Sequence, residues 1–175
     1  MSKAFEINYL NESDAESLCF LMTSNADIFK RFFTKTLSQN KSIESSRLYI
    51  SKKAKEIDQK AEFTFAIRNE NNEIIGLVIL KDIHWDSGEG ELAYCIDKHQ
   101  QGKGIVSQSV KYVSDLAFKK LGLKTLKIFA HKSNLPSIRV AEKTDFLWVK
   151  TMSKSYQPPN EAPLDMELYE LHYEK

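Results

Sequence analysis

The 175-residue sequence has little of several features that would place it in a specialised class. It has two cysteines, Cys19 and Cys95, far apart and without a CxxC motif, so we expect reduced, packed thiols. No apolar run approaches the roughly 20 residues that a membrane-spanning helix needs. The segment 1–6 lacks the apolar stretch of a signal peptide. No His, Cys and Asp residues have metal-ligand spacing, so we expect no metal. These absences favour a cytoplasmic protein with no membrane partner.

Charge of one sign is also not in excess. The sequence has 25 basic and 24 acidic residues, a formal net charge of +1, which gives no electrostatic reason to expect a nucleic-acid partner. The lysines at 52–55 and 119–127 are interpreted as solvated helix faces or strand ends. With 42% hydrophobic and 28% charged residues, the chain can bury a core, and we expect one domain over 1–175.

Hydrophobic periodicity predicts the elements. Alternation and apolar runs indicate strands, and apolar residues recurring at helical spacing indicate helices. In chain order we expect a strand at 4–10, helices at 14–25 and 43–57, strands at 63–68, 74–83 and 91–97, a helix at 105–121, a strand at 124–130, a helix at 136–143, and strands at 146–150 and 164–173. The order β-αα-βββ-α-β-α-ββ predicts an α/β fold (α+β mixed), with a mixed, mostly antiparallel sheet and helices on both faces.

Local signals fix some boundaries of these elements. Ser13 and Glu16 have the spacing of a capping box, which would start the first helix at about Asp14. In the second helix, Leu48 and Ile50 are assigned to the apolar side. Gly122 follows the helix that starts at 105 and suits a left-handed C-cap.

The most informative segment is the glycine loop at 97–104, between a strand and a helix start. Gly102 and Gly104 let the backbone approach a ligand and point successive N–H groups outward. The partial positive charge of a helix N-terminus adds to them. This combination predicts a site for a phosphate or pyrophosphate.

Two familiar phosphate loops do not fit the segment. A P-loop has four residues between its glycines, whereas this loop has only Lys103. A dinucleotide loop needs a third glycine where Ser107 stands, and an acidic residue about 20 positions on, where Lys124 and Leu126 stand. A tight turn with purely geometric glycines stays open on the loop alone.

Three segments together resemble the GNAT superfamily of N-acetyltransferases. Residues 101–107, QGKGIVS, are similar to that family's pyrophosphate loop. Residues 134–143, NLPSIRVAEK, resemble its N-x-x-S-x-x-V-x-E-K block, and residues 90–96, GELAYCI, resemble a strand of the branch with the ribosomal-protein alanine acetyltransferases. Two residues depart from the pattern. His99 replaces Gln or Arg, and Asp145 replaces a glycine whose left-handed backbone Asp can tolerate.

The resemblance implies acetyl-CoA as co-substrate and a GNAT-like fold over nearly the whole chain. It implies that backbone N–H groups near 94–96 meet the oxyanion and that Asn134 contacts the pantetheine arm or orders the following helix. The residues expected to bind the cofactor are Tyr94, Cys95, Ile96, Gln101, Gly102, Lys103, Gly104, Ile105, Val106, Ser107 and Asn134.

Two side chains are candidates for the chemistry. An amine must lose its proton before it attacks a thioester, and Glu91 lies on the strand that leads into the loop, so it is the candidate base. The alternative is an exposed strand residue. The resemblance implies that Ser137 protonates the leaving thiolate; the alternative is that it only hydrogen-bonds its own helix start.

The expected function is acetyl transfer to a primary amine, and a protein or peptide N-terminal α-amine is favoured. A small amine such as a polyamine, an amino acid or an antibiotic is the alternative acceptor, and a non-catalytic acyl-CoA-binding sensor is the alternative class. The residues 29–33 and 156–163 are expected to wall the acceptor side, unless they are ordinary core and an ordinary connector. The oligomeric state is open, with a homodimer among the options.

Overall fold

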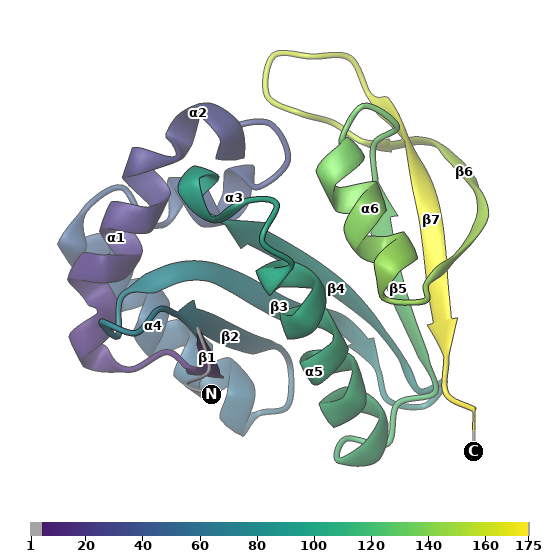
Figure 1. Cartoon of the computed structure of the whole chain (residues 1–175), viewed down its shortest axis with the longest axis horizontal. Coiled ribbons are helices and arrows are strands. Elements are labelled where there is room, and N and C mark those ends of the chain that lie inside the picture. Colours follow the sequence, from purple (N-terminus) through teal and green to yellow (C-terminus); the bar gives the residue numbers. More distant parts are fainter. Residues whose placement is uncertain (1–4, 175) are drawn as a thin grey trace. The chain divides into compact units, whose positions relative to one another are not determined.

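The computed structural model describes residues 5–174 and contains seven strands and six α-helices in that range (Figure 1). Its elements are β1 (Glu6–Tyr9), η1 (Glu12–Asp14), α1 (Ala15–Ser24), α2 (Ala26–Phe29), α3 (Thr34–Ser38), α4 (Ile43–Asp58), β2 (Phe63–Arg68), β3 (Ile74–His84), β4 (Glu89–Ile96), η2 (Lys98–Gln100), α5 (Ile105–Lys119), β5 (Thr125–Ala130), α6 (Leu135–Lys143), β6 (Leu147–Tyr156) and β7 (Leu164–His172). The predicted order is confirmed, with the short helices α2 and α3 added. Ala4, the expected first strand residue, lies outside the described residues.

The strands are hydrogen-bonded in the order β1-β2-β3-β4-β5-β7-β6. The pair β4–β5 is parallel, whereas β1–β2, β5–β7 and β6–β7 are antiparallel. The predicted mixed, mostly antiparallel sheet is therefore confirmed. A crossover connection is needed wherever neighbouring strands are parallel, and α5 supplies it between β4 and β5.

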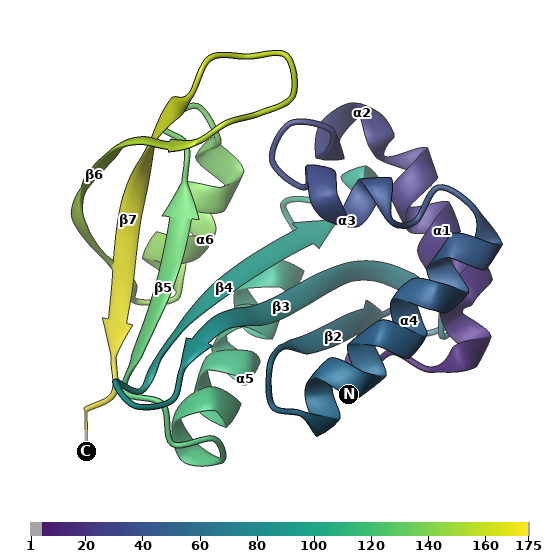
Figure 2. The same cartoon turned by 180° about the vertical axis from the view of Figure 1, so that it is seen from behind.

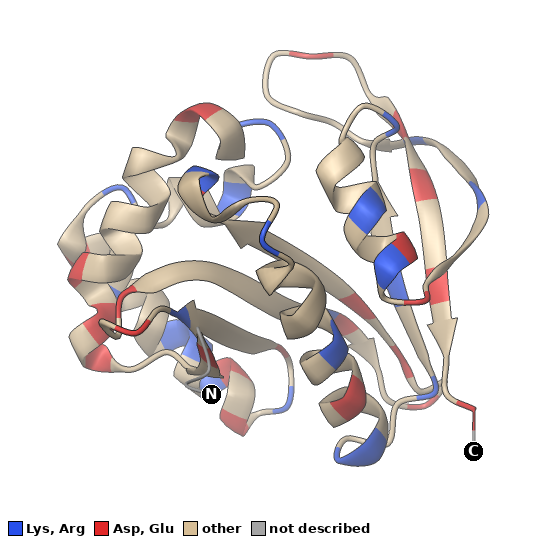
Figure 3. Ribbon diagram, viewed as in Figure 1, with Lys and Arg blue, Asp and Glu red and all other residues tan. Residues whose placement is uncertain are grey.

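The chain forms two compact units. Among the described residues, the first contains 5–79 together with Tyr94–Ile105, and the second contains Leu80–Ala93 and 106–174. Strands β3 and β4 each contribute residues to both units. Figure 3 shows basic and acidic segments interspersed along the helices of each unit.

In the first unit, a capping box begins at Asn11, two residues before the predicted one at Ser13. The Asn11 side chain accepts a hydrogen bond from the Ser13 amide (3.1 Å), and Asp14 accepts one from the Asn11 amide (2.7 Å). The predicted box of Ser13 and Glu16 is wrong because the 3-10 turn η1 precedes α1. Asp14 is buried and pairs with Arg68, whose guanidinium is 2.5 Å from the Asp14 carboxylate. A buried charge needs such a partner, so this pair fastens β2 to the start of α1.

The helix α4 packs against α1 and β2 (Figure 2). Its buried residues are Ser46, Tyr49, Ile50 and Lys53, which follow the i, i+3, i+4, i+7 spacing of a single stripe. Leu48 is off that stripe and 66% exposed, so its assignment to the apolar side is wrong. The solvated interpretation of the lysine cluster is also wrong for Lys53. Its ammonium is 2.7 Å from Glu56 and also pairs with Glu62.

The second unit is built on β5, which alternates between buried and partly buried residues. Leu126, Ile128 and Ala130 form its buried side, and α6 packs against this strand (Figure 1). Gly122 has φ of +75° just after α5, as predicted for a left-handed C-cap. This C-cap depends on the backbone preference of a single residue, which is why it could be predicted from the sequence.

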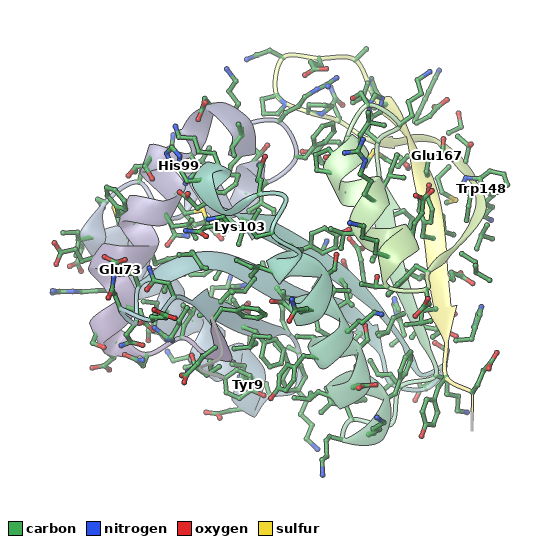
Figure 4. All side chains as sticks on the ribbon, viewed as in Figure 1. Tyr9, Glu73, His99, Lys103, Trp148 and Glu167 are labelled. Atoms are coloured by element: carbon green, nitrogen blue, oxygen red, sulfur yellow. The ribbon has the colours of Figure 1, made fainter. Side chains whose placement is uncertain are left out.

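The strand β6 is longer than the predicted 146–150, because it continues through register shifts to Tyr156. Most of its residues are exposed, so no hydrophobic alternation marked the extension. It is held to β7 by side chains as well as backbone: the Trp148 indole donates to Glu167 at 2.5 Å (Figure 4). Within residues 5–174, no helix is both long and apolar enough to cross a membrane.

Candidate functional site

The glycine loop follows β4 as predicted. Asp97 caps the short turn η2 by accepting a hydrogen bond from the His99 amide (2.8 Å). Gly102 and Gly104 then adopt φ of +76° and +75°, and α5 begins at Ile105. A Cβ at Gly102 would meet no atom within 4 Å, so glycine is needed there for its backbone angle and not for space. The predicted sequence of strand, glycine loop and helix is confirmed.

This loop has the geometry of an anion site. Left-handed residues next to a helix start turn successive N–H groups toward one side, and the helix contributes a partial positive charge there. The first turn of α5 holds no acidic side chain that would compete with an anion. Lys103 is exposed (Figure 4), and its ammonium is 2.9 Å from the Gln100 side-chain oxygen. The loop can therefore hold a phosphate or pyrophosphate mainly through its backbone.

The candidate base Glu91 lies on β4 in the second unit. The parallel ladder between β4 and β5 runs from Glu89 opposite Thr125 to Glu91 opposite Lys127. The Glu91 side chain is only 21% exposed, and its Oε1 is 3.1 Å from the Lys81 ammonium on β3. The alternative interpretation of an exposed strand residue is therefore wrong. Lys81 also contacts Asp82 at 3.2 Å, so three charged groups form one cluster.

Burial and charge act on Glu91 in opposite directions. Burial raises the pKa of the Glu91 carboxyl, and the positive charge and hydrogen bond of Lys81 oppose part of that rise. Burial acts to lower the pKa of Lys81, but Glu91 and Asp82 outweigh it, so this pKa lies above its usual value. The result is a carboxylate that binds a proton more tightly than an ordinary glutamate, which suits a general base.

Glu89, two residues earlier, shows the contrasting case. It lies at the strand start, and its Oε2 is 3.1 Å from the Lys127 ammonium. The hydrogen bond and charge of Lys127 lower its pKa, the direction opposite to that for Glu91. Of the two glutamates, only Glu91 has the raised proton affinity that a base at neutral pH requires.

The strand residues Tyr94, Cys95 and Ile96 follow Glu91 on β4. Cys95 is free and buried, so the prediction of a reduced, packed thiol is confirmed for this residue, and burial raises the pKa of the thiol to about 12. Tyr94 and Ile96 are partly buried. The carbonyl oxygen of Cys95 would lie 2.6 Å from a Cβ at Gly76, which shows how closely β3 approaches this part of β4.

The second predicted motif forms the start of α6. The Asn134 side chain accepts a hydrogen bond from the Ser137 amide (3.4 Å), and Pro136 occupies the first turn. Asn134 therefore orders the helix, one of its two expected roles. Ser137 is partly buried, and Asp145, after the helix, has φ of +66°, the left-handed backbone expected where the family has glycine.

The segments expected beside the acceptor have different surroundings. Phe29 is a core residue at 5% exposure, whereas the Arg31 guanidinium lies over the Phe32 ring at 4.9 Å. Residues 157–163 connect β6 to β7 as an irregular loop. Their place beside an acceptor stays a prediction. In residues 5–174 no three His, Cys, Asp or Glu side chains are grouped so that they could hold a metal.

Sequence reasoning missed two residues that contact the candidate site: Lys81, which pairs with Glu91, and Asn25, which binds the start of the glycine loop. Lys81 and Glu91 are equidistant from Asp86 in the turn between β3 and β4, so hairpin symmetry was a usable signal for their pairing. Asn25 reaches the glycine loop across more than 70 residues of sequence, and no local pattern marks such a contact.

Known proteins are similar to this chain in sequence and in fold. The sequence profile of the Acetyltransferase (GNAT) domain family matches residues 5–147. A probable N-acetyltransferase from Bacillus subtilis (strain 168), YjcK, is 30% identical over 146 residues, which cover 82% of this chain and 81% of that protein.

Two solved structures have the same fold. One is a ribosomal-protein-S5-alanine acetyltransferase from Vibrio fischeri, with a TM-score of 0.87, 20% identity and coverage of 98% of this chain and 94% of that one. The other is RimL, a ribosomal L7/L12 α-N-protein acetyltransferase in complex with coenzyme A, with a TM-score of 0.88, 20% identity and coverage of 98% and 95%.

The chain therefore belongs to the GNAT family of acetyltransferases, and all three predicted motifs begin within the matched residues. It is an N-acetyltransferase that uses acetyl-CoA.

Proposed function

We propose that this enzyme acetylates the N-terminal α-amine of a protein or peptide. In this proposal the backbone of residues 101–107 holds the pyrophosphate of acetyl-CoA, with Asn134 ordering the segment beside the pantetheine arm. The observation that carries it is the pair of left-handed glycines immediately before α5, on the chain segment that continues from Glu91 through β4. Such a loop binds an anion through its backbone.

The proposed reaction assigns a role to each candidate group. The Glu91 carboxylate, directly or through a water, removes a proton from the acceptor ammonium. The amine nitrogen forms a bond to the thioester carbonyl carbon, and backbone N–H groups at 94–96 stabilise the oxyanion. The carbon–sulfur bond then breaks, and Ser137 donates its proton to the leaving thiolate. The nitrogen still carries one proton more than an amide does, and it passes that proton through water to Ser137. Glu91 then releases the proton that it took from the ammonium.

The cost of deprotonation favours an α-amine over a lysine side chain. An α-amine has a pKa of about 7.7–8.0 and lysine about 10.4, so far more of the α-amine is neutral at pH 7. A single carboxylate with a moderately raised pKa can serve the first more easily than the second. The names of the two solved relatives, an alanine acetyltransferase of ribosomal protein S5 and an α-N-acetyltransferase of L7/L12, support the same choice.

Competing peptide substrates test the acceptor. We expect a higher kcat/KM for a short peptide with a free N-terminus than for the same peptide with a blocked N-terminus and an internal lysine. Spermine, as a small amine, should be a poorer acceptor than the free peptide because the protein has no acidic excess to steer a polycation. A preference for the lysine peptide or for spermine would contradict the proposed acceptor. Acetyl-CoA binding without turnover of any amine would favour the sensor.

A further inference from the structure

The entrance of the glycine loop is fastened to the junction of two helices. Asn25 stands between α1, which ends at Ser24, and α2, which begins at Ala26, and its side chain is completely buried. A fully buried amide needs partners for both its donor and its acceptor groups. Its partners identify what this residue holds in place.

The Asn25 amide joins α1 to the first residues after β4. Its Oδ1 accepts a hydrogen bond from the Lys98 amide at 2.9 Å, and its Nδ2 donates to Asp97 Oδ2 at 2.8 Å. Nδ2 also donates to the Leu21 carbonyl at 2.9 Å, one turn back in α1. The Lys98 ammonium reaches the Ser24 carbonyl at 3.2 Å. All of these residues belong to the first unit.

Asp97 also makes hydrogen bonds to the residues that follow it, toward the two glycines. Its Oδ1 accepts from the His99 amide at 2.8 Å, and its carbonyl accepts from the Gln100 amide at 2.9 Å. Its own amide donates to the Ile75 carbonyl on β3 at 2.8 Å. The chain is thus held from Asp97 to Gln100, directly before the segment that contains Gly102 and Gly104.

We propose that Asn25 is a positioning residue for the pyrophosphate-binding loop. Glycines allow the left-handed turns of the loop but have more conformational freedom than other residues, so the N–H groups of the loop keep their direction only if its entrance is fixed. Fixing it before the ligand arrives removes an ordering cost from binding. This inference rests on the proposed role of residues 101–107 in holding the pyrophosphate.

The chain offers a matched control in Asn40. This asparagine is also completely buried, and its Nδ2 donates to the carbonyl four residues back, Thr36, at 2.8 Å, as that of Asn25 does to Leu21. Its Oδ1 accepts from the Ser46 hydroxyl at 2.8 Å, and within residues 5–174 its side chain makes no hydrogen bond to the glycine loop. Asn25→Ala and Asn40→Ala should therefore cause similar losses of thermal stability but differ in their effect on the loop.

The decisive readout is the preference for acetyl-CoA over acetyl-pantetheine, which lacks the pyrophosphate. Asn25→Ala should lower kcat/KM for acetyl-CoA by roughly tenfold or more, mainly through KM, because the loop must be ordered on binding. It should leave kcat/KM for acetyl-pantetheine close to that of the unaltered enzyme, so the preference shrinks. Asn40→Ala should keep the full preference. Equal preferences in the two variants would overturn the inference.

A side-chain exchange tests the bond itself. Asn25→Asp removes the donor and sets two carboxylates against each other, so the preference should fall. The double variant Asn25→Asp with Asp97→Asn exchanges the two groups, so the amide at position 97 can donate to the carboxylate at position 25. That carboxylate can still accept from the Lys98 amide, and much of the preference should return. A double variant as poor as Asn25→Asp would contradict a direct bond.

Two further variants keep the outcomes separate. If Asn25→Ala does not fold, Asp97→Ala removes the same link from a partly exposed residue and should show the same loss of preference. If Gly104→Val also leaves coenzyme A affinity unchanged, the proposed pyrophosphate loop fails. If Gly104→Val weakens binding and neither Asn25→Ala nor Asp97→Ala does, only the role of Asn25 fails.

Discussion

The two ends of β4 carry candidate functional groups that are held in place by different interactions. At the Glu91 end, the side chains interact through charge: Lys81 on β3 lies within ion-pair distance of both Asp82 on β3 and Glu91 on β4. At the Ile96 end, the glycine loop depends on backbone angles and on the neutral amide of Asn25. The first arrangement responds to pH, and the second depends on shape. Substitutions at the two ends should therefore separate in their effects on turnover, on affinity and on pH dependence.

The largest expected effect breaks the charged end. Glu91→Gln keeps the size of the side chain but removes its proton affinity, so turnover should fall by roughly 10²- to 10⁴-fold. Binding of coenzyme A, measured by calorimetry, should stay unchanged because the glycine loop is intact. Glu89→Gln is the matched control, since the same change is made two residues earlier at a carboxylate with a lowered pKa. Comparable losses in both variants would remove Glu91 from the role of base.

The next largest effect breaks the backbone end. Gly104→Val places a β-branched residue at φ of +75°, which is strained, and its side chain blocks backbone approach to a phosphate. Coenzyme A affinity should fall by at least about tenfold, or about 1.4 kcal/mol. Gly122→Val is the matched control, because Gly122 has the same φ of +75° and open space around its Cβ position after α5. It should lose thermal stability and keep coenzyme A affinity.

The smallest effect sharpens the electrostatic side of the comparison. Lys81→Met removes the charge that lowers the pKa of Glu91 and leaves burial and Asp82, both of which raise it. The base is active when deprotonated, so the acidic limb of the pH profile of kcat/KM should move to higher pH. Lys127, opposite Glu91 in the ladder, stays in place. Activity should fall most below the new pKa and recover as the pH rises.

A control and an independent measurement accompany the Lys81 variant. Lys119→Met removes an exposed lysine that pairs with Asp115 at 3.3 Å, and it should leave the pH profile in place. Carboxyl-carbon NMR of Glu91 reports its pKa without reference to turnover. An NMR shift without a change in the pH profile would mean that Glu91 titrates but does not limit the reaction.

The sequence predicted what local physics controls. Gly122 marked a left-handed position because few other residues adopt that backbone, and Pro136 marked a helix start. Gly102 and Gly104 marked a loop whose backbone can approach a ligand. Contacts between residues far apart in the sequence have no local pattern that predicts them. Examples are the contacts of Arg68 with Asp14 and of Asn25 with Asp97, which form only when separate elements pack together. Leu48 was assigned to the buried side of α4, but it is exposed. The elements that pack against α4 determine which of its sides is buried, and the hydrophobicity of one residue does not.

The buried Cys95 has a practical consequence for measuring this enzyme. Burial raises the pKa of this thiol to about 12, so at neutral pH it stays in the thiol form. Reagents that detect free thiols react with the thiolate and need access to the sulfur. A colorimetric assay of the coenzyme A thiol released in each turnover should therefore not record Cys95 in the folded enzyme. In enzyme without acetyl-CoA, a rise in that signal beyond the contribution of the partly exposed Cys19 would report unfolding, so the same assay can monitor the integrity of the first unit.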